Sequence, residues 1–156
     1  MRVISGKNRG TKLVAPEGMT TRPTDDMLKE NIFNLIGPIK PDSNVLDLFA
    51  GSGQIGIEFL SRGAKSAVFV DNNIKAIKSI KQNLEKTKHT DEAKVIKSSA
   101  TIALSRLRGE RFDYIYLDPP YDEKNFLLEV FNIIDKSDII KIGTEIIIET
   151  VKDFSI

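Results

Sequence analysis

The stretch DLFAGSGQIG, residues 47–56, joins an apolar run that predicts a β-strand to a segment that predicts a helix. Gly51, Gly53 and Gly56 have the G-x-G-x-x-G spacing, which lets the backbone approach a ligand closely. Asp71 ends the next apolar run, where an acidic residue would bind ribose hydroxyls. This pattern alone leaves open a dinucleotide, an adenosylmethionine and a purely structural turn.

The rest of the chain alternates between the same two patterns. Apolar, β-rich runs predict strands at 45–48, 67–70, 94–96, 114–117 and 145–148, and helical stretches lie at 54–62, 74–87, 101–108 and 126–135. Strand-helix-strand repetition predicts an α/β fold with a mainly parallel twisted sheet and helices on both faces. Ligands then bind at the carboxyl ends of the strands. We expect residues 1–156 to form one domain.

The N-terminal segment differs from this core. Residues 2–5 and 11–14 predict a β-hairpin arm around the turn GKNRG. Residues 1–22 hold five basic residues and one acidic residue, whereas the whole chain has a net charge of +1. Such an arm suits contact with nucleic-acid phosphates, and the alternative is a solvated hairpin with chance charges. The helix that follows should begin with Thr24 as its cap, and its apolar face should hold Leu28, Ile32, Leu35 and Ile36.

Composition excludes several classes of site. The chain has no cysteine, which excludes disulfides, thiolate zinc sites and a cysteine nucleophile. His89 is the only histidine and lies in a polar run, so we expect a plain loop residue and no metal site. No apolar run approaches the ~20 residues of a membrane span, and the first residues lack a signal-peptide core, so we expect a cytoplasmic protein.

Asp47 favours one of the ligands that the glycine pattern leaves open. A carboxylate at this position would repel a pyrophosphate and attract the ammonium and sulfonium groups of S-adenosylmethionine. The alternative is that Asp47 accepts hydrogen bonds from amides of its own loop.

A second motif, LDPPY at residues 117–121, follows the fourth predicted strand. The Asp118 carboxylate and a backbone carbonyl of the proline pair could accept both N–H groups of an exocyclic base amine and aim its lone pair at a methyl donor. The prolines fix the loop, and Tyr121 could stack on a base turned out of its helix. The alternative is a strand-ending turn with a chance aromatic residue.

The motifs DLFAGSG, VFVD and LDPPY, in this order, resemble the adenosylmethionine-dependent methyltransferases that modify exocyclic amines. ISGKNRGTKL and TRPTDDMLKENIFN are similar to the bacterial small-subunit ribosomal RNA guanine-N2 methyltransferases, the RsmD family. The resemblance implies a Rossmann-like class I methyltransferase fold. It also implies methyl transfer from S-adenosylmethionine to N2 of one guanine in 16S ribosomal RNA, within an assembling small subunit. We expect a monomer.

The resemblance also implies roles for individual residues. Asp118, Pro119 and Tyr121 would hold the guanine. The cofactor would be bound by Thr24, Asp47, Ala50, Gly51, Ser52, Gly53, Asp71, Asn72, Ser99 and Ala100, of which Asp71 and Asn72 face the ribose and Ser99 and Ala100 the adenine. RNA would be contacted by Arg9, Lys12, Arg22 and Lys29, the last at a position where many members carry arginine.

The chain departs from the family at its end, VKDFSI, where the family fold continues with a helix and an antiparallel strand pair. We therefore expect this strand pair to be missing and residues 146–148 to form an exposed sheet edge.

Two other functions fit parts of the pattern. One is an NAD-type dinucleotide oxidoreductase built on the glycine loop and Asp71, and the other is a non-catalytic RNA-binding assembly factor on the same fold.

Overall fold

The computed structural model describes residues 1–18, 26–119 and 124–149. Its centre is a parallel sheet of five strands in the order β3-β2-β1-β4-β5. The strands are β1 (Asn44–Asp47), β2 (Ser66–Asp71), β3 (Ala93–Lys97), β4 (Tyr114–Leu117) and β5 (Glu145–Ile148). All five lie where the apolar runs predicted them.

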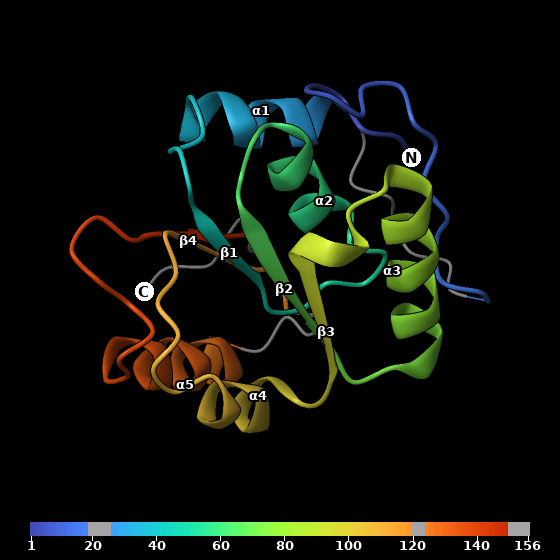
Figure 1. The fold of residues 1–156 in the computed structure, drawn as a ribbon. Coiled ribbons are helices and arrows are strands. Elements are labelled where there is room, and N and C mark those ends of the chain that lie inside the picture. Colours follow the sequence, from blue (N-terminus) through green and yellow to red (C-terminus); the bar gives the residue numbers. More distant parts are fainter. Residues whose placement is uncertain (19–25, 120–123, 150–156) are drawn as a thin grey trace.

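Helices cover both faces of this sheet (Figure 1). On one face lie α1 (Asp26–Ile36), α2 (Gln54–Ser61) and α3 (Ile74–Thr87), whose apolar side chains share a core cluster with the sheet. On the other face α4 (Ala100–Arg106) and α5 (Lys124–Asp135) form a second cluster. A short 3₁₀ turn, η1 (Thr90–Glu92), connects α3 to β3. The predicted α/β class with helices on both faces is confirmed.

The apolar face predicted for α1 is confirmed only in part, since Ile32 and Ile36 pack against the core cluster but the other two residues do not. Leu28 and Leu35 are exposed, at 39% and 90% of their surface, whereas Phe33 and Lys29 are buried. The buried side of the helix thus includes a lysine, which lies 3.8 Å from a buried carboxylate, Glu58 of α2. The predicted N-cap, Thr24, lies outside the described residues.

The N-terminal arm, residues 1–14, packs against α2 and α3 instead of projecting from the fold. Its two limbs pair through one isolated antiparallel bridge, Arg2 with Lys12, so the two regular strands of the predicted hairpin do not form. Val3 and Leu13 enter the core cluster. Because the arm covers its outer face, every residue of α2 is buried.

Polar side chains bind this arm along its length. Glu58 accepts the amides of Ile4 and Ser5 at 2.9 and 3.0 Å. Asn8 donates from its side chain to the Thr87 carbonyl at 2.9 Å and contacts His89 Nε2 at 2.6 Å. His89 is a loop residue, as predicted, but it is also a buried partner of the arm, and burial lowers its pKa.

Among the described residues, no helix has the length and apolar character needed to cross a membrane.

Candidate active site

Three aspartates stand at the carboxyl ends of neighbouring strands. Asp47 ends β1, Asp71 ends β2, and Asp118 directly follows β4. β1 pairs with β2 on one side and with β4 on the other, all in parallel, so the three carboxylates reach the same edge of the sheet. We call this edge, where the three acids gather, the acidic crevice; it would attract a cationic ligand.

The glycine loop between β1 and α2 closes over this edge. Ala50 donates its amide to the Val70 carbonyl at 2.9 Å, and Gly53 donates to Ala50 at 2.7 Å. Gly51 and Gly53 have φ angles of 57° and 81°, in the left-handed region that glycine tolerates best. A Cβ on Gly51 would meet no described atom within 4 Å, so this side of the loop is open to a ligand.

Gly56 has a different role. A Cβ at this position would lie 2.4 Å from Cε1 of Phe69, so glycine lets α2 pack directly on β2. Its amide donates to Asp47 Oδ2 at 3.1 Å. The third glycine of the motif therefore belongs to the packing of the helix, while the first faces the open side of the loop.

Asp47 is buried, with 1% of its surface exposed. Burial raises its pKa to about 7, against the lowering effect of the Gly56 amide, and the charges of Asp118 and Asp71 raise it further. Asp47 does accept an amide, but it is that of Gly56 in α2 and not one of its own loop. This bond uses one carboxylate oxygen and still leaves an acid in the crevice.

Asp71 organises two loops at once. Its Oδ2 accepts the Gly51 amide at 2.9 Å, and its Oδ1 accepts the Asn73 amide at 3.0 Å. Asn73 in turn caps α3 by accepting from Lys75 at 2.8 Å, whereas Asn72 is exposed. The acid at the end of β2 thus fixes the glycine loop to the start of the next helix.

The loop after β3 lies beside Asp71, whose carbonyl accepts the Ser98 amide at 3.0 Å. Ser99 caps α4, and its hydroxyl accepts from Ile102 at 3.4 Å. The Ala100 side chain lies in the core cluster beneath. An adenine here would meet Ser99 and the backbone rather than an exposed Ala100 side chain.

Asp118 has a neighbour that the sequence reasoning missed. Glu149 directly follows β5, and its amide donates to the Leu117 carbonyl at 2.8 Å. Its carboxylate accepts the Tyr116 hydroxyl and hydrogen-bonds to Asp118. Burial, followed by the charge and hydrogen bond of Glu149, raises the pKa of Asp118 to about 7. The signal was available, because an acid after the fifth parallel strand reaches the same edge as the other three.

A buried amide connects the glycine loop to the arm. The side chain of Asn83, on α3, accepts from the Val14 amide at 2.7 Å and donates to the carbonyls of Val14 and Ser52, both at 2.9 Å. Asn83 is fully buried. This one side chain thus holds both the arm, which carries the predicted RNA contacts Arg9 and Lys12, and the loop that is predicted to bind the cofactor.

The predicted RNA contacts separate into two groups. Arg9 and Lys12 are exposed on the arm, as an RNA contact requires. Lys29 is fully buried, and its Nζ donates to the Arg2 carbonyl at 2.6 Å and to Gln54 Oε1 at 3.2 Å. It lies 3.8 Å from Glu58, so the prediction that Lys29 contacts RNA does not fit this structure.

The described residues include two of the three predicted guanine-binding positions, Asp118 and the half-buried Pro119. Tyr121, Arg22 and Thr24 lie outside them, so their roles stay predictions.

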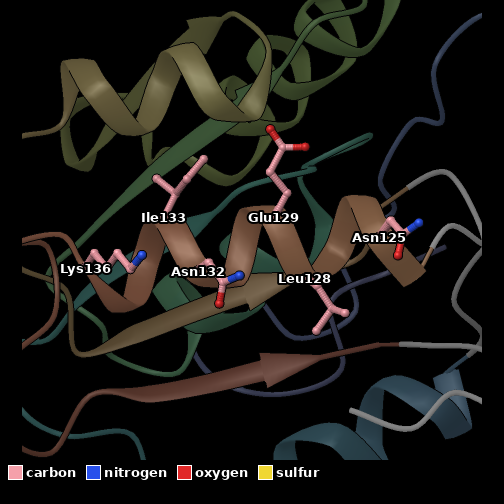
Figure 2. A pocket seen from close by; sticks show the side chains of 6 residues that line it. All are labelled: Asn125, Leu128, Glu129, Asn132, Ile133 and Lys136. Atoms are coloured by element: carbon pink, nitrogen blue, oxygen red, sulfur yellow. The ribbon is translucent and has the colours of Figure 1, made fainter.

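A separate hollow of about 470 Å³ lies along α5 (Figure 2) and is lined by Asn125, Leu128, Glu129, Asn132, Ile133 and Lys136. All six lining residues come from that one helix, and Glu129 and Leu128 point in opposite directions. This hollow brings no cluster of reactive groups together and is not part of the candidate site.

Comparison with known proteins agrees with this geometry. The family model described as "Conserved hypothetical protein 95" matches residues 1–156. YlbH of Bacillus subtilis is 47% identical over 138 residues, covering 87% of this chain and 74% of YlbH. "Ribosomal RNA small subunit methyltransferase D" of Haemophilus influenzae is 35% identical over 155 residues, covering 98% of this chain and 80% of that protein.

Solved structures give the same result for the fold. The structure of yhhF from Escherichia coli has a TM-score of 0.87 and 31% identity, covering 100% of this chain and 85% of yhhF. The five-stranded parallel sheet is the Rossmann-like class I methyltransferase fold. The chain belongs to the family of the small-subunit ribosomal RNA methyltransferase D proteins.

Proposed function

We propose that this protein transfers a methyl group from S-adenosylmethionine to the exocyclic N2 of a guanine in 16S ribosomal RNA. The observation that carries the proposal is the position of Asp118 on the strand next to the one that ends in Asp47, beside the open glycine loop. Relatives named as ribosomal RNA small subunit methyltransferases support the class of substrate. Such a substrate makes the cytoplasm the expected location.

The residues present fit a cationic methyl donor. Asp71 would accept ribose hydroxyls while it holds the Gly51 amide. Asp47, together with the open side of Gly51, would receive the positively charged methionine end. S-Adenosylmethionine supplies a methyl group that its sulfonium already activates, so the protein needs to position the acceptor more than to perform acid-base chemistry.

Asp118 would bind and deprotonate the guanine amine, which accepts the methyl group. In its ionised form it accepts an N–H of the guanine amine and takes up the proton that the nitrogen loses when the new C–N bond forms. A carboxyl group whose pKa is about 7 is suited to exchange this proton near neutral pH. Pro119 restricts the backbone next to it, which keeps the acceptor oxygen in place.

The acidic crevice argues against a dinucleotide oxidoreductase. A pyrophosphate on the glycine loop would lie near Asp47, which itself feels the charge of Asp118, and these carboxylates would repel it, whereas Asp71 suits the ribose of either ligand. Titration of the purified protein with NADH and with S-adenosylmethionine separates the two ligands, and tight NADH binding without adenosylmethionine binding would sink the proposed cofactor.

The reaction is tested with small ribosomal subunits purified from a strain that lacks the modification. We expect labelled methyl to enter 16S ribosomal RNA at guanine N2, as mapped by mass spectrometry. Asp118→Ala should reduce single-turnover transfer by about 100-fold or more while donor affinity is kept. Glu129→Ala, which removes an exposed acid on α5, is the matched control. Methylation of adenine, or equal activity of the two variants, would contradict the proposal. RNA binding without turnover would indicate an assembly factor.

A further inference from the structure

Glu149 places a second carboxyl group beside Asp118, where the acceptor base would bind. It follows β5, whose last residue, Ile148, pairs with Leu117 of β4. The Glu149 amide then donates to the Leu117 carbonyl at 2.8 Å, so Asp118 and Glu149 continue two paired strands side by side. Their side chains hydrogen-bond to each other. In the proposed reaction Asp118 has a role, whereas Glu149 has none.

The carboxylate of Glu149 is held in place by Tyr116 of β4. Its Oε2 accepts the Tyr116 hydroxyl, and Tyr116 is buried. Burial, followed by the hydrogen bond and the charge of Glu149, raises the pKa of Tyr116, so the hydroxyl keeps its proton and remains the donor. A carboxylate has about four acceptor positions, and the Tyr116 hydroxyl occupies a single one. Glu149 therefore keeps acceptor capacity for Asp118 or for a ligand.

Glu149 is not sealed inside the fold. It is half-buried and borders a hollow of about 580 Å³ between α1 and β5. Most of the residues that line this hollow are apolar, among them Ile32 and Ile36 of α1, and Tyr116 borders it as well. Glu149 thus lies next to Asp118 at a place that a ligand can reach.

Two carboxyl groups in contact need a hydrogen between them. An ionised carboxylate only accepts hydrogen bonds, so Asp118 and Glu149 are satisfied by one shared proton, with the loss of one negative charge. A ligand with two neighbouring N–H groups would satisfy both carboxylates with its own hydrogens. Burial, followed by the charge and hydrogen bond of Glu149, raises the pKa of Asp118 to about 7, so the shared proton can leave near neutral pH when such a ligand binds.

Guanine carries this pair of neighbouring donors at its reacting amine. The N2 amine of guanine has N1–H, a donor, on one side and N3, an acceptor, on the other. The N6 amine of adenine lies between two acceptors, N1 and N7, and the N4 amine of cytosine lies beside the acceptor N3. A second carboxylate next to the one that holds the amine therefore attracts guanine and repels adenine and cytosine.

We propose that Glu149 accepts the N1–H of the target guanine while Asp118 accepts an N–H of its N2 amine, and that Glu149 thereby selects guanine over adenine and cytosine. The inference rests on the proposed function for its substrate, and it adds the residue that reads the base and the hydrogen that is read. N2 gains the methyl group as the C–S bond breaks with its electron pair on sulfur, and the N2 proton goes to Asp118. N1 keeps its hydrogen. Tyr116 is a positioning residue, since it acts through Glu149.

The test compares two RNA substrates that differ at N1 of the target base. Once the methylated nucleotide is mapped, 16S ribosomal RNA is ligated from fragments with either guanosine or 2-aminopurine riboside at that position and is assembled into small subunits. 2-Aminopurine keeps the amine at C2 but has an acceptor at N1. Single-turnover transfer by the wild type and by Glu149→Gln is measured at a pH where neither rate changes with pH, so that an altered pKa of Asp118 does not enter.

We expect the wild type to prefer guanosine, and Glu149→Gln to reduce this preference by about 10- to 100-fold. The neutral amide accepts N1–H less strongly than a carboxylate and can donate to N1 of 2-aminopurine. A defect in folding or in donor binding would slow transfer to both RNAs alike and leave their ratio unchanged. The matched control is Glu145→Gln, at the exposed other end of β5, which should leave both rates unchanged.

An unchanged ratio in Glu149→Gln would overturn the proposal and leave Glu149 as a structural partner of Tyr116. The wild-type comparison does not depend on the folding of any variant. If the wild type methylates 2-aminopurine as fast as guanosine, no group of the site reads N1–H, and the proposal fails on that result as well. Absence of methyl transfer to guanosine by the wild type would count against the proposed function instead.

Discussion

The buried charge of Glu58 gives the sharpest prediction for stability. Its carboxylate accepts the Ile4 and Ser5 amides and the Arg62 Nε, and it is the counter-ion nearest to the fully buried Lys29. In Glu58→Gln, one carboxylate oxygen becomes an NH₂ group that faces donors, and Lys29 loses its balancing charge. Breaking a buried ion pair from one side costs about 3–5 kcal/mol. For a chain of this length that lowers Tm by roughly 6–20 °C.

Urea unfolding at neutral pH, followed by circular dichroism, measures this loss. The double variant Glu58→Gln/Lys29→Met should be less destabilised than the sum of the single variants, because no unpaired cation then remains in the core. Asp26→Asn is the control, since it breaks the exposed pair with Arg2 and should change stability by less than about 1 kcal/mol. A change below about 1 kcal/mol for Glu58→Gln as well would refute the argument that this carboxylate holds the arm.

Three further predictions concern the crevice and its support. Glu149→Gln should move the acid limb of the pH profile of single-turnover transfer to lower pH, because the Glu149 carboxylate raises the pKa of Asp118. Gly56→Ala should lower the free energy of unfolding by about 1–3 kcal/mol or more, as measured in urea, because its Cβ would meet the Phe69 ring. The pKa of Asp47 is raised to about 7, so the folded state binds more protons than the unfolded state and stability without ligand should fall as pH rises from about 4 through 7. Urea unfolding at several pH values should show a smaller fall in Asp47→Asn, and an unchanged fall would contradict the assigned burial.

The elements of the sheet could be predicted from sequence because each depends on local pattern. Apolar runs of three or four residues predicted all five strands, which are four to six residues long, and the glycine motif marked the loop at the end of β1. That the acids at the strand ends lie at one edge of the sheet followed from the parallel topology alone. Glu149 follows the same rule, but it was passed over because it belongs to no motif.

The features that were mispredicted depend on partners far away in the sequence. Lys29 looks like a surface cation until Glu58 is placed opposite it. The loop position of His89 was predicted, but its contact with Asn8 was not, since Asn8 lies 81 positions away in the chain. No periodicity within one helix or loop contains such information.

The way in which the arm is attached constrains the order in which the protein can form. Asn8 and Val14 find their partners 79 and 69 positions later, at Thr87 and Asn83. During synthesis, the arm must therefore wait, with Val3 and Leu13 uncovered, until α3 has been made. The arm can thus dock as soon as residues 54–89 have folded, before β4 and β5 are made, so the half of the sheet that carries α2 and α3 has these partners of the arm.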